Sequence, residues 1–153
     1  RGFSFECRLV GGTLPGEAYM TEEIRSHIKH QGLSDVVTIA GRRSEEETKA
    51  EMDNATVVVL PSESEGLPVV LCEALARCRC PVASDLHGCR DALHDSKHGI
   101  LVPLNDTSAL ADGLLSAHET TTSAKAKLLE GRHYALDRFT FDGYAEALRN
   151  VIM

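Results

Sequence analysis

The sequence predicts an α/β fold in which a parallel sheet carries helices on both of its faces. Three observations lead to this prediction. Short apolar segments alternate along the chain with longer segments whose apolar residues recur at helical spacing. The apolar segments barely alternate between apolar and polar residues, which is typical of strands that are buried on both faces. Strands and helices that alternate in this way favour right-handed crossovers and therefore parallel strands.

The predicted strands are short apolar runs that end at turn residues or at a helix start. The first ends at Gly11-Gly12, a pair with turn chemistry. The clearest is the run of three valines before Leu60, which ends at Pro61. The predicted strands cover residues 5–10, 36–40, 56–60, 82–84 and 100–102.

The predicted helices begin and end at recognisable residues. Gly32 is a stop signal for the first helix, and Ser44 with Glu47 forms the capping box of the second. Pro68 suits the first turn of the third helix, and Asp106 caps a later one. The predicted helices cover about residues 17–31, 44–54 and 68–77, a segment after 106, and 123–153 with a break near 139–142.

Length, composition and charge limit the classes of protein. A chain of 153 residues fits one domain with a real core, and no apolar run approaches the roughly 18 residues of a membrane helix. The first residues do not form a signal peptide and begin directly with a strand, as a fragment of a longer chain would. The formal net charge of −7 disfavours broad attraction to nucleic acid or anionic lipid, but backbone amides can still hold a phosphate.

The cysteines and histidines between residues 78 and 98 raise the question of a zinc site. A C-x-C pair followed by scattered histidines matches the known spacings of structural zinc sites poorly. The odd total of five cysteines indicates free thiols in a reducing cytosol. We therefore expect buried, inert thiols and no metal from this group, which contains Cys78, Cys80, His87, Cys89, His94 and His98.

Two glutamates near the third predicted strand are candidates for a site. In open parallel sheets, ligands bind beyond the carboxyl ends of the strands. Glu65 lies in the loop after that strand, and Glu73 lies eight positions later on the next helix, so helical spacing puts both nearly on one face. Glu73 stands in an apolar turn and needs a polar partner there, such as a ligand hydroxyl. The alternative is that Glu73 is a surface residue and Glu65 caps the helix, and spacing leaves both readings open.

The same segment resembles a known family. Residues 61–76, PSESEGLPVVLCEALA, are similar to the E-x7-E signature of family 4 glycosyltransferases. Further segments resemble the family's strands and loops in the same order over about residues 7–115. These segments are 9–12, 37–42, 83–88 and 99–103 followed by Asp106.

The resemblance implies a retaining, two-domain GT-B enzyme whose Rossmann-like C-terminal half holds a nucleotide-sugar. Residues 1–153 would be that single nucleotide-sugar-binding domain, truncated at its N-terminal edge and without the acceptor domain. The implied reaction moves a hexose-type sugar from a nucleoside-diphosphate sugar to an acceptor in polysaccharide biosynthesis, with no metal and no cofactor besides this co-substrate. The implied location is cytoplasmic, with any membrane contact made through the absent half.

The resemblance also implies roles for particular residues. Glu65 would contact the donor sugar as the catalytic glutamate, and Glu73 would bind the ribose hydroxyls. Backbone amides at the helix start would approach the diphosphate and sugar, which makes Gly66, Leu67 and Val69 candidates.

Two further loops complete the implied site. Gly41 and Arg42 would border the base, where an arginine either stacks on the ring or stays in solvent. Gly88 and Arg90 are candidates for phosphate contacts in the loop after the fourth strand.

Several positions depart from the family pattern. The chain lacks the G-R-x…K-G segment that grips the donor diphosphate in the family. Pro68 stands where glycine is frequent and removes one amide donor, and His87 and Asp91 replace a glycine and a glutamate.

The competing interpretations are a non-catalytic nucleotide-sugar-binding module and another GT-B enzyme, such as a nucleotide-sugar epimerase.

Overall fold

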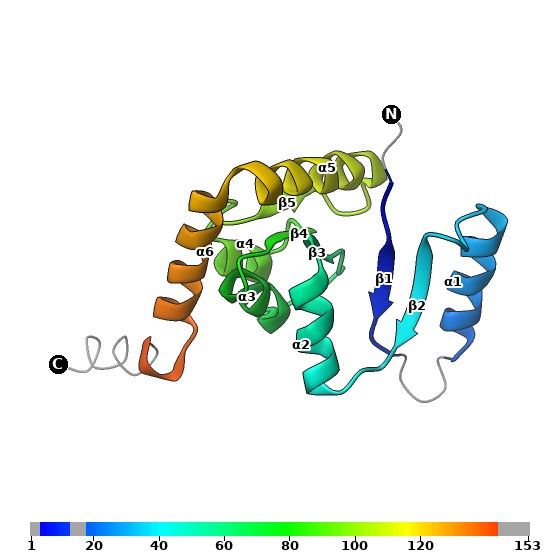
Figure 1. The fold of residues 1–153 in the computed structure, drawn as a ribbon, viewed down its shortest axis with the longest axis horizontal. Helices are drawn as coiled ribbons and strands as arrows, with labels where there is room; N and C mark the ends of the chain where they lie inside the picture. Colours follow the sequence, from blue (N-terminus) through cyan, green and yellow to red (C-terminus); the bar gives the residue numbers. More distant parts are fainter. Residues whose placement is uncertain (1–3, 13–17, 144–153) are drawn as a thin grey trace. The chain divides into compact units, whose positions relative to one another are not determined.

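The computed structural model describes residues 4–12 and 18–143 of the chain (Figure 1). The chain divides into two compact units, Arg1–Glu51 and Met52–Met153, and each unit is described by itself. Strands and helices alternate through both units, and every strand pair in the described residues is parallel. This alternation is the pattern that the sequence predicts.

The first unit contains two paired strands and one helix between them in the chain. Strands β1 (Cys7–Val10) and β2 (Val37–Gly41) lie side by side, and α1 (Ala18–His30) belongs to the segment that connects them. The register shifts between Leu9 and Val10, so that Val10 lies opposite Gly41. Gly41 has a φ of +72°, a conformation that favours glycine, and its carbonyl accepts the Gly11 amide at 3.0 Å.

Helix α2 (Glu45–Asn54) begins at the capping box that the sequence predicts. The Ser44 amide donates to the Glu47 carboxylate at 2.8 Å, and the Glu47 amide donates to the Ser44 hydroxyl at 3.2 Å. Arg8 on β1 donates to both oxygens of Glu51 at 2.6 and 2.7 Å. The Arg8 guanidinium thereby holds the pKa of the Glu51 carboxyl below its usual range.

The second unit is a three-stranded parallel sheet with helices on both faces. Its strands are β3 (Val57–Leu60), β4 (Cys80–Ser84) and β5 (Ile100–Val102), in the order β3-β4-β5. Because side chains alternate along a strand, Cys80 and Val82 face one side of β4 and Ala83 faces the other. The described structure therefore confirms helices on both faces of a parallel sheet.

Each face of this sheet has its own core. Helix α5 (Thr107–Ser123) covers the face with Val82, and Gly113 lets it approach closely, since a Cβ there would lie 2.9 Å from a Val102 methyl. Helices α3 (Val69–Ala76), α4 (His87–Leu93) and α6 (Lys125–Arg138) cover the opposite face. The buried members of that second core are Leu71, Leu75, Ala83, Cys89, Ala92, Leu93 and Ala135.

Several boundaries differ from the predicted ones. Strand β4 begins at Cys80 instead of residue 82, and helix α4 was not predicted at all. The clearest of the predicted buried strands, β3, is partly exposed, with Val59 39% exposed, whereas all of β4 is buried. The predicted break near residue 139 is confirmed, since α6 ends at Arg138, and the prediction for residues 144–153 lies outside the described residues.

Among residues 4–12 and 18–143, no helix combines the length and the apolar character that a membrane crossing requires. Within the same ranges, no group of three or more histidine, cysteine, aspartate or glutamate side chains is placed to hold a metal ion. All five cysteines are free thiols, as predicted. Cys80 and Cys89 are buried as expected, but Cys78 is only partly buried, so the expectation of a buried thiol is wrong there.

Candidate functional site

The loop between β3 and α3, residues 61–68, carries the first glutamate of the motif and is called the Glu65 loop below. Glu65 is half-buried, and its carboxylate accepts a hydrogen bond from the Ser62 hydroxyl at 2.6 Å. The loop leaves the carboxyl end of β3, where ligands bind in parallel sheets. The structure therefore places Glu65 at the edge of the sheet that the sequence predicts.

Helix α3 begins without a side-chain cap. Pro68 occupies the N-cap position, and no side chain of the described residues accepts a hydrogen bond from the first turn. Glu65 is therefore not the cap of α3, and this part of the alternative is wrong, whereas its other part is confirmed, because Glu73 is an exposed residue. Because the first amides of a helix have no partner within the helix, the amides around Val69 remain open to solvent or to a ligand. The side chains of Leu67 and Val69 beside them are 50% and 63% exposed.

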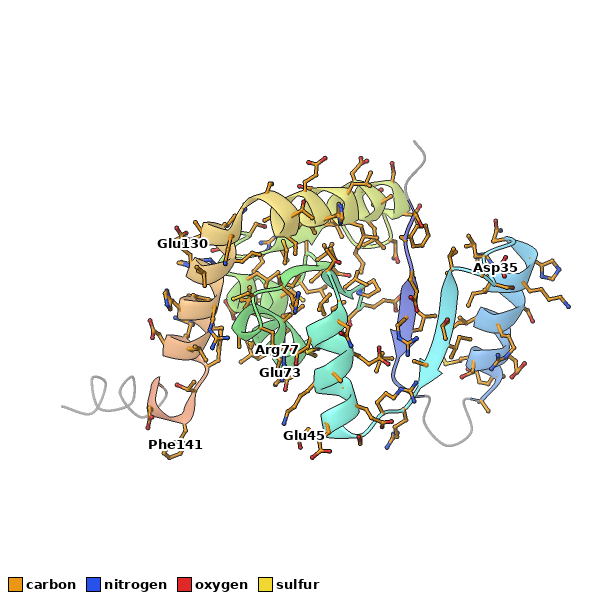
Figure 2. The ribbon with its side chains drawn as sticks, in the orientation of Figure 1. Asp35, Glu45, Glu73, Arg77, Glu130 and Phe141 are labelled. Carbon is orange, nitrogen blue, oxygen red and sulfur yellow. The ribbon has the colours of Figure 1, made fainter. Side chains whose placement is uncertain are left out.

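Glu73 lies on the exposed side of α3, where Figure 2 labels it. Its apolar neighbours Leu71, Ala74 and Leu75 are buried and turn toward the core, so the expectation that Glu73 stands in apolar surroundings is wrong. Its exposed carboxylate is accessible to solvent, and it can accept a ligand hydroxyl without a burial cost. Because α3 begins at Val69, helical spacing does not set the direction of Glu65 relative to Glu73.

The turn after β4 packs directly against the Glu65 loop. Gly88 is buried in the first turn of α4, and a Cβ built on it would lie 1.7 Å from the Gly66 carbonyl oxygen and 3.0 Å from that of Glu65. No residue other than glycine fits this approach of two backbones. The structure therefore brings together three of the predicted site residues, Glu65, Gly66 and Gly88.

Arg90 forms an ion pair inside the same turn. Its Nε donates to Asp85 Oδ1 at 2.5 Å and its Nη2 donates to Oδ2 at 2.8 Å. The Arg90 guanidinium holds the pKa of the Asp85 carboxyl below its usual range, and the carboxylate raises the pKa of Arg90 in return. Arg90 lies on helix α4 and not in the predicted loop, and two of its donors are already bound to protein.

Two neighbours of this turn differ in exposure. The Cys89 thiol is fully buried, and burial raises its pKa, with the negative charge of Glu65 adding to the increase. Cys89 directly follows Gly88, which packs against the Glu65 loop. His87, by contrast, is 93% exposed at its side chain, and its Nε2 lies 3.7 Å from Asp91 Oδ2.

Gly41 and Arg42 belong to the first unit and form a group of their own. Arg42 is exposed. It lies beside the Gly11-Gly12 turn, since a Cβ on Gly12 would be 3.5 Å from Arg42 Cβ. Its side chain is therefore free to reach a flat ligand at the carboxyl ends of β1 and β2.

Sequence reasoning missed three residues of the site: Ser62, Asp85 and Cys89. Asp85 directly follows β4, and a carboxylate at the carboxyl end of a predicted strand is a signal that could have identified it. Ser62 lies three positions before Glu65, a spacing at which loop side chains can bond one another. Cys89 carried no signal, because its closeness to Glu65 arises only from the packing of α4.

The comparisons with known proteins agree with one another. Residues 2–120 match the family model described as glycosyl transferases group 1. The putative colanic acid biosynthesis glycosyltransferase WcaL of Escherichia coli K12 is 36% identical over 137 residues, which are 85% of this chain and 32% of WcaL. The chain thus spans about a third of the length of this curated relative.

Two solved structures share the fold. HepE of Anabaena in complex with UDP superimposes with a TM-score of 0.84 at 21% identity, covering 97% of this chain and 40% of HepE. HepE has also been solved in complex with UDP-glucose. The sucrose-phosphate synthase of Thermosynechococcus elongatus gives a TM-score of 0.81 at 26% identity, covering 95% of this chain and 37% of the synthase.

Proposed function

Because this chain belongs to the group 1 glycosyl transferases and has the fold of the C-terminal domain of a GT-B enzyme, we propose that it is the donor-binding part of a retaining glycosyltransferase. The donor in this proposal is a nucleoside-diphosphate sugar that carries a hexose-type sugar. One observation carries the proposal furthest: an uncapped helix start and a half-buried glutamate lie together at the carboxyl ends of β3 and β4. The binding of UDP and UDP-glucose to HepE supports the choice of donor class.

The proposed diphosphate site is the start of α3. The open amides around Gly66, Leu67 and Val69 can donate to phosphate oxygens, and the positive end of the helix dipole favours an anion there. Pro68 supplies no amide, so the donors come from the residues on either side of it. Gly88 and Arg90 lie in the turn that packs against this loop and are proposed to belong to the same site.

The two glutamates take different roles in the proposal. Glu65, restrained by Ser62, accepts hydroxyl hydrogen bonds from the donor sugar. Glu73, one turn into α3, accepts both ribose hydroxyls, because an ionised carboxylate has acceptor capacity for two of them. Gly41 and Arg42 of the first unit are proposed to border the base.

The proposed chemistry depends on position and charge more than on a side-chain base. The departing diphosphate takes the acceptor proton on the same face of the sugar, and the α3 amides stabilise the charge that develops on the diphosphate. The proposal needs no metal and no cofactor besides the co-substrate. The acceptor domain lies in the part of the enzyme outside this chain, and polysaccharide assembly is the proposed process, as the name of WcaL indicates for that relative. Free thiols fit a cytoplasmic location.

Calorimetric titration with UDP, GDP and ADP tests the ribose contact of Glu73. Substitution Glu73→Ala should weaken the nucleotide that binds by about 1.5–3 kcal/mol, or roughly ten- to hundredfold in Kd, because a charge-assisted hydrogen bond is lost. Glu130→Ala is the matched control, since Glu130 is an exposed glutamate on α6, and it should leave the Kd unchanged.

Two results would contradict the proposal. Equal Kd values for the native chain and Glu73→Ala would remove Glu73 from the site. No nucleotide binding by the chain or by a longer protein that includes the acceptor domain would reject the donor-binding role. Nucleotide binding without donor hydrolysis in that longer protein would favour the non-catalytic module.

A further inference from the structure

We propose that Asp85 and Arg90 are positioning residues that hold the Glu65 loop in place through Gly88. The proposal rests on the proposed function, because the position of the loop matters to catalysis only if Glu65 contacts the donor sugar. Neither Asp85 nor Arg90 has to touch the donor in this role.

The first step is the contact between two backbones. Gly88 lies so close to the Gly66 carbonyl that a single added carbon would be 1.7 Å from its oxygen. No flexible side chain lies between the two segments to absorb a displacement. A movement of the first turn of α4 therefore either presses on the peptide of Glu65 and Gly66 or leaves it unsupported.

Three hydrogen-bonded contacts hold the segment from Asp85 to Arg90 in place. The Asp85 amide donates to the Val102 carbonyl at 2.8 Å, so Asp85 is attached to the end of β5. The Asp85 carboxylate accepts two hydrogen bonds from the Arg90 guanidinium, and the Arg90 amide donates to the Leu86 carbonyl at 2.9 Å. A two-point contact of this kind resists rotation as well as separation. Gly88 lies between Asp85 and Arg90, within the segment that this contact closes.

Few other restraints act on Glu65 and Gly66 within the loop. The contact between Ser62 and Glu65 joins two residues of the loop itself and does not attach it to the sheet. No side chain of the described residues caps α3, and Gly66 has open space on its Cβ side. Pro68 at the end of the loop is buried, and the packing against Gly88 is the restraint from α4 that reaches Glu65 and Gly66.

A direct contact between Arg90 and the donor diphosphate is the alternative, and it predicts a different pattern. If Arg90 binds the phosphate, Arg90→Met weakens UDP binding, whereas Asp85→Asn removes a competing anion and strengthens it. If the pair positions the loop, both substitutions act in the same direction. The double variant then behaves like either single variant, because each removes the same interaction.

Backbone 15N relaxation on the ligand-free chain tests the positioning role. The order parameters of the Glu65 and Gly66 amides should fall from about 0.85 toward about 0.6 in Asp85→Asn, in Arg90→Met and in the double variant. Arg77→Met is the matched control, since it breaks the ion pair of Arg77 with Asp53 (2.5 Å). It should leave both order parameters unchanged.

Two outcomes of this measurement would overturn the proposal. One is an unchanged order parameter at Glu65 and Gly66 in the three variants. The other is an equal fall at Ala109 in α5, which would mean that the pair supports the whole second unit. Because no ligand is present, the result stands whether or not the chain proves to bind a nucleotide.

Titration of the same variants with UDP and with UDP-glucose gives the functional readout. Loss of position at Glu65 and Gly66 should lower the affinity for UDP-glucose by about threefold or more in both single variants, and UDP affinity should move in the same direction in the two variants, since Gly66 belongs to the proposed diphosphate site. Opposite changes in UDP affinity for Asp85→Asn and Arg90→Met would establish the direct phosphate contact and reject the positioning role.

Discussion

The loops after β3 and β5 leave the same edge of one sheet, but the helices that follow them begin differently. Helix α5 is capped by Asp106, whose carboxylate accepts the Ala109 amide at 2.8 Å. Helix α3 has Pro68 at its N-cap position, with no side-chain cap. In α5 a side chain accepts an amide of the first turn, whereas in α3 no side chain does so and the Val69 and Val70 amides stay available. The difference indicates which of the two helix starts can hold a ligand.

The core compensates for the missing cap of α3. A side-chain cap contributes about 1 kcal/mol to stability, and full burial of one leucine side chain contributes about 2 kcal/mol. Leu71 and Leu75 are both buried on α3, whereas the buried residues of α5 are the small Gly113 and Ala117. Helix α3 therefore stays in place without a cap, and its start remains open.

The largest effect is expected from Gly88→Ala, which removes the support of the open loop. The new methyl would lie 1.7 Å from the Gly66 carbonyl oxygen, so one backbone has to move, at a cost of about 3 kcal/mol of unfolding free energy. Urea denaturation measures this loss. The control is Gly66→Ala, which meets nothing within 4 Å and should change stability by less than about 1 kcal/mol. Equal stabilities for the two variants would contradict the close approach.

A smaller effect is expected from Asp106→Ala, which makes the start of α5 resemble that of α3. Loss of the hydrogen bond to the Ala109 amide should cost about 1 kcal/mol of unfolding free energy. Thermal unfolding should show it as a fall in Tm of a few degrees. Nucleotide affinity should not change, because the cap of α5 is outside the proposed donor site. Asp106→Asn should retain most of the stability, and a loss equal to that of the alanine variant would argue against the cap.

The smallest effect concerns pH and the Asp85–Arg90 pair. The folded-state pKa of Asp85 is lowered by Arg90, so the pair contributes stability above the unfolded pKa and loses it as pH falls through the folded value. Because both side chains are partly exposed, this contribution is small. Denaturation of the native chain and of Asp85→Asn between about pH 7 and pH 2 should give curves that converge at low pH. Parallel curves over the whole range would contradict the linkage.

Local signals in the sequence predicted the capped elements correctly. The capping box of Ser44 and Glu47 and the cap of Asp106 are both present, because each depends on residues within one turn. Helix α4 was missed because its N-cap residue is Leu86, which offers no side-chain bond, and because seven residues are too few for a helical period to show. The start of β4 was placed two residues too late because Pro81 follows Cys80, and proline is unusual in a central strand.

The site was predictable only in part. The E-x7-E pattern located Glu65 and Glu73, but the packing of Gly88 on the Glu65 loop is a tertiary contact that no spacing rule contains. The bond between Asp85 and Arg90 links positions five apart, whereas neighbours on a helix face are three or four apart. Predicting it requires knowing that the chain turns between β4 and α4.

The approach of Gly88 to Gly66 also bears on the order in which the chain folds. The two glycines are 22 positions apart, and they can meet only after β3 and β4 have paired and α3 has crossed between them. The Glu65 loop therefore acquires its final shape after the sheet, and not as a local turn formed early. Refolding followed at this loop should lag behind refolding followed at the capped start of α5.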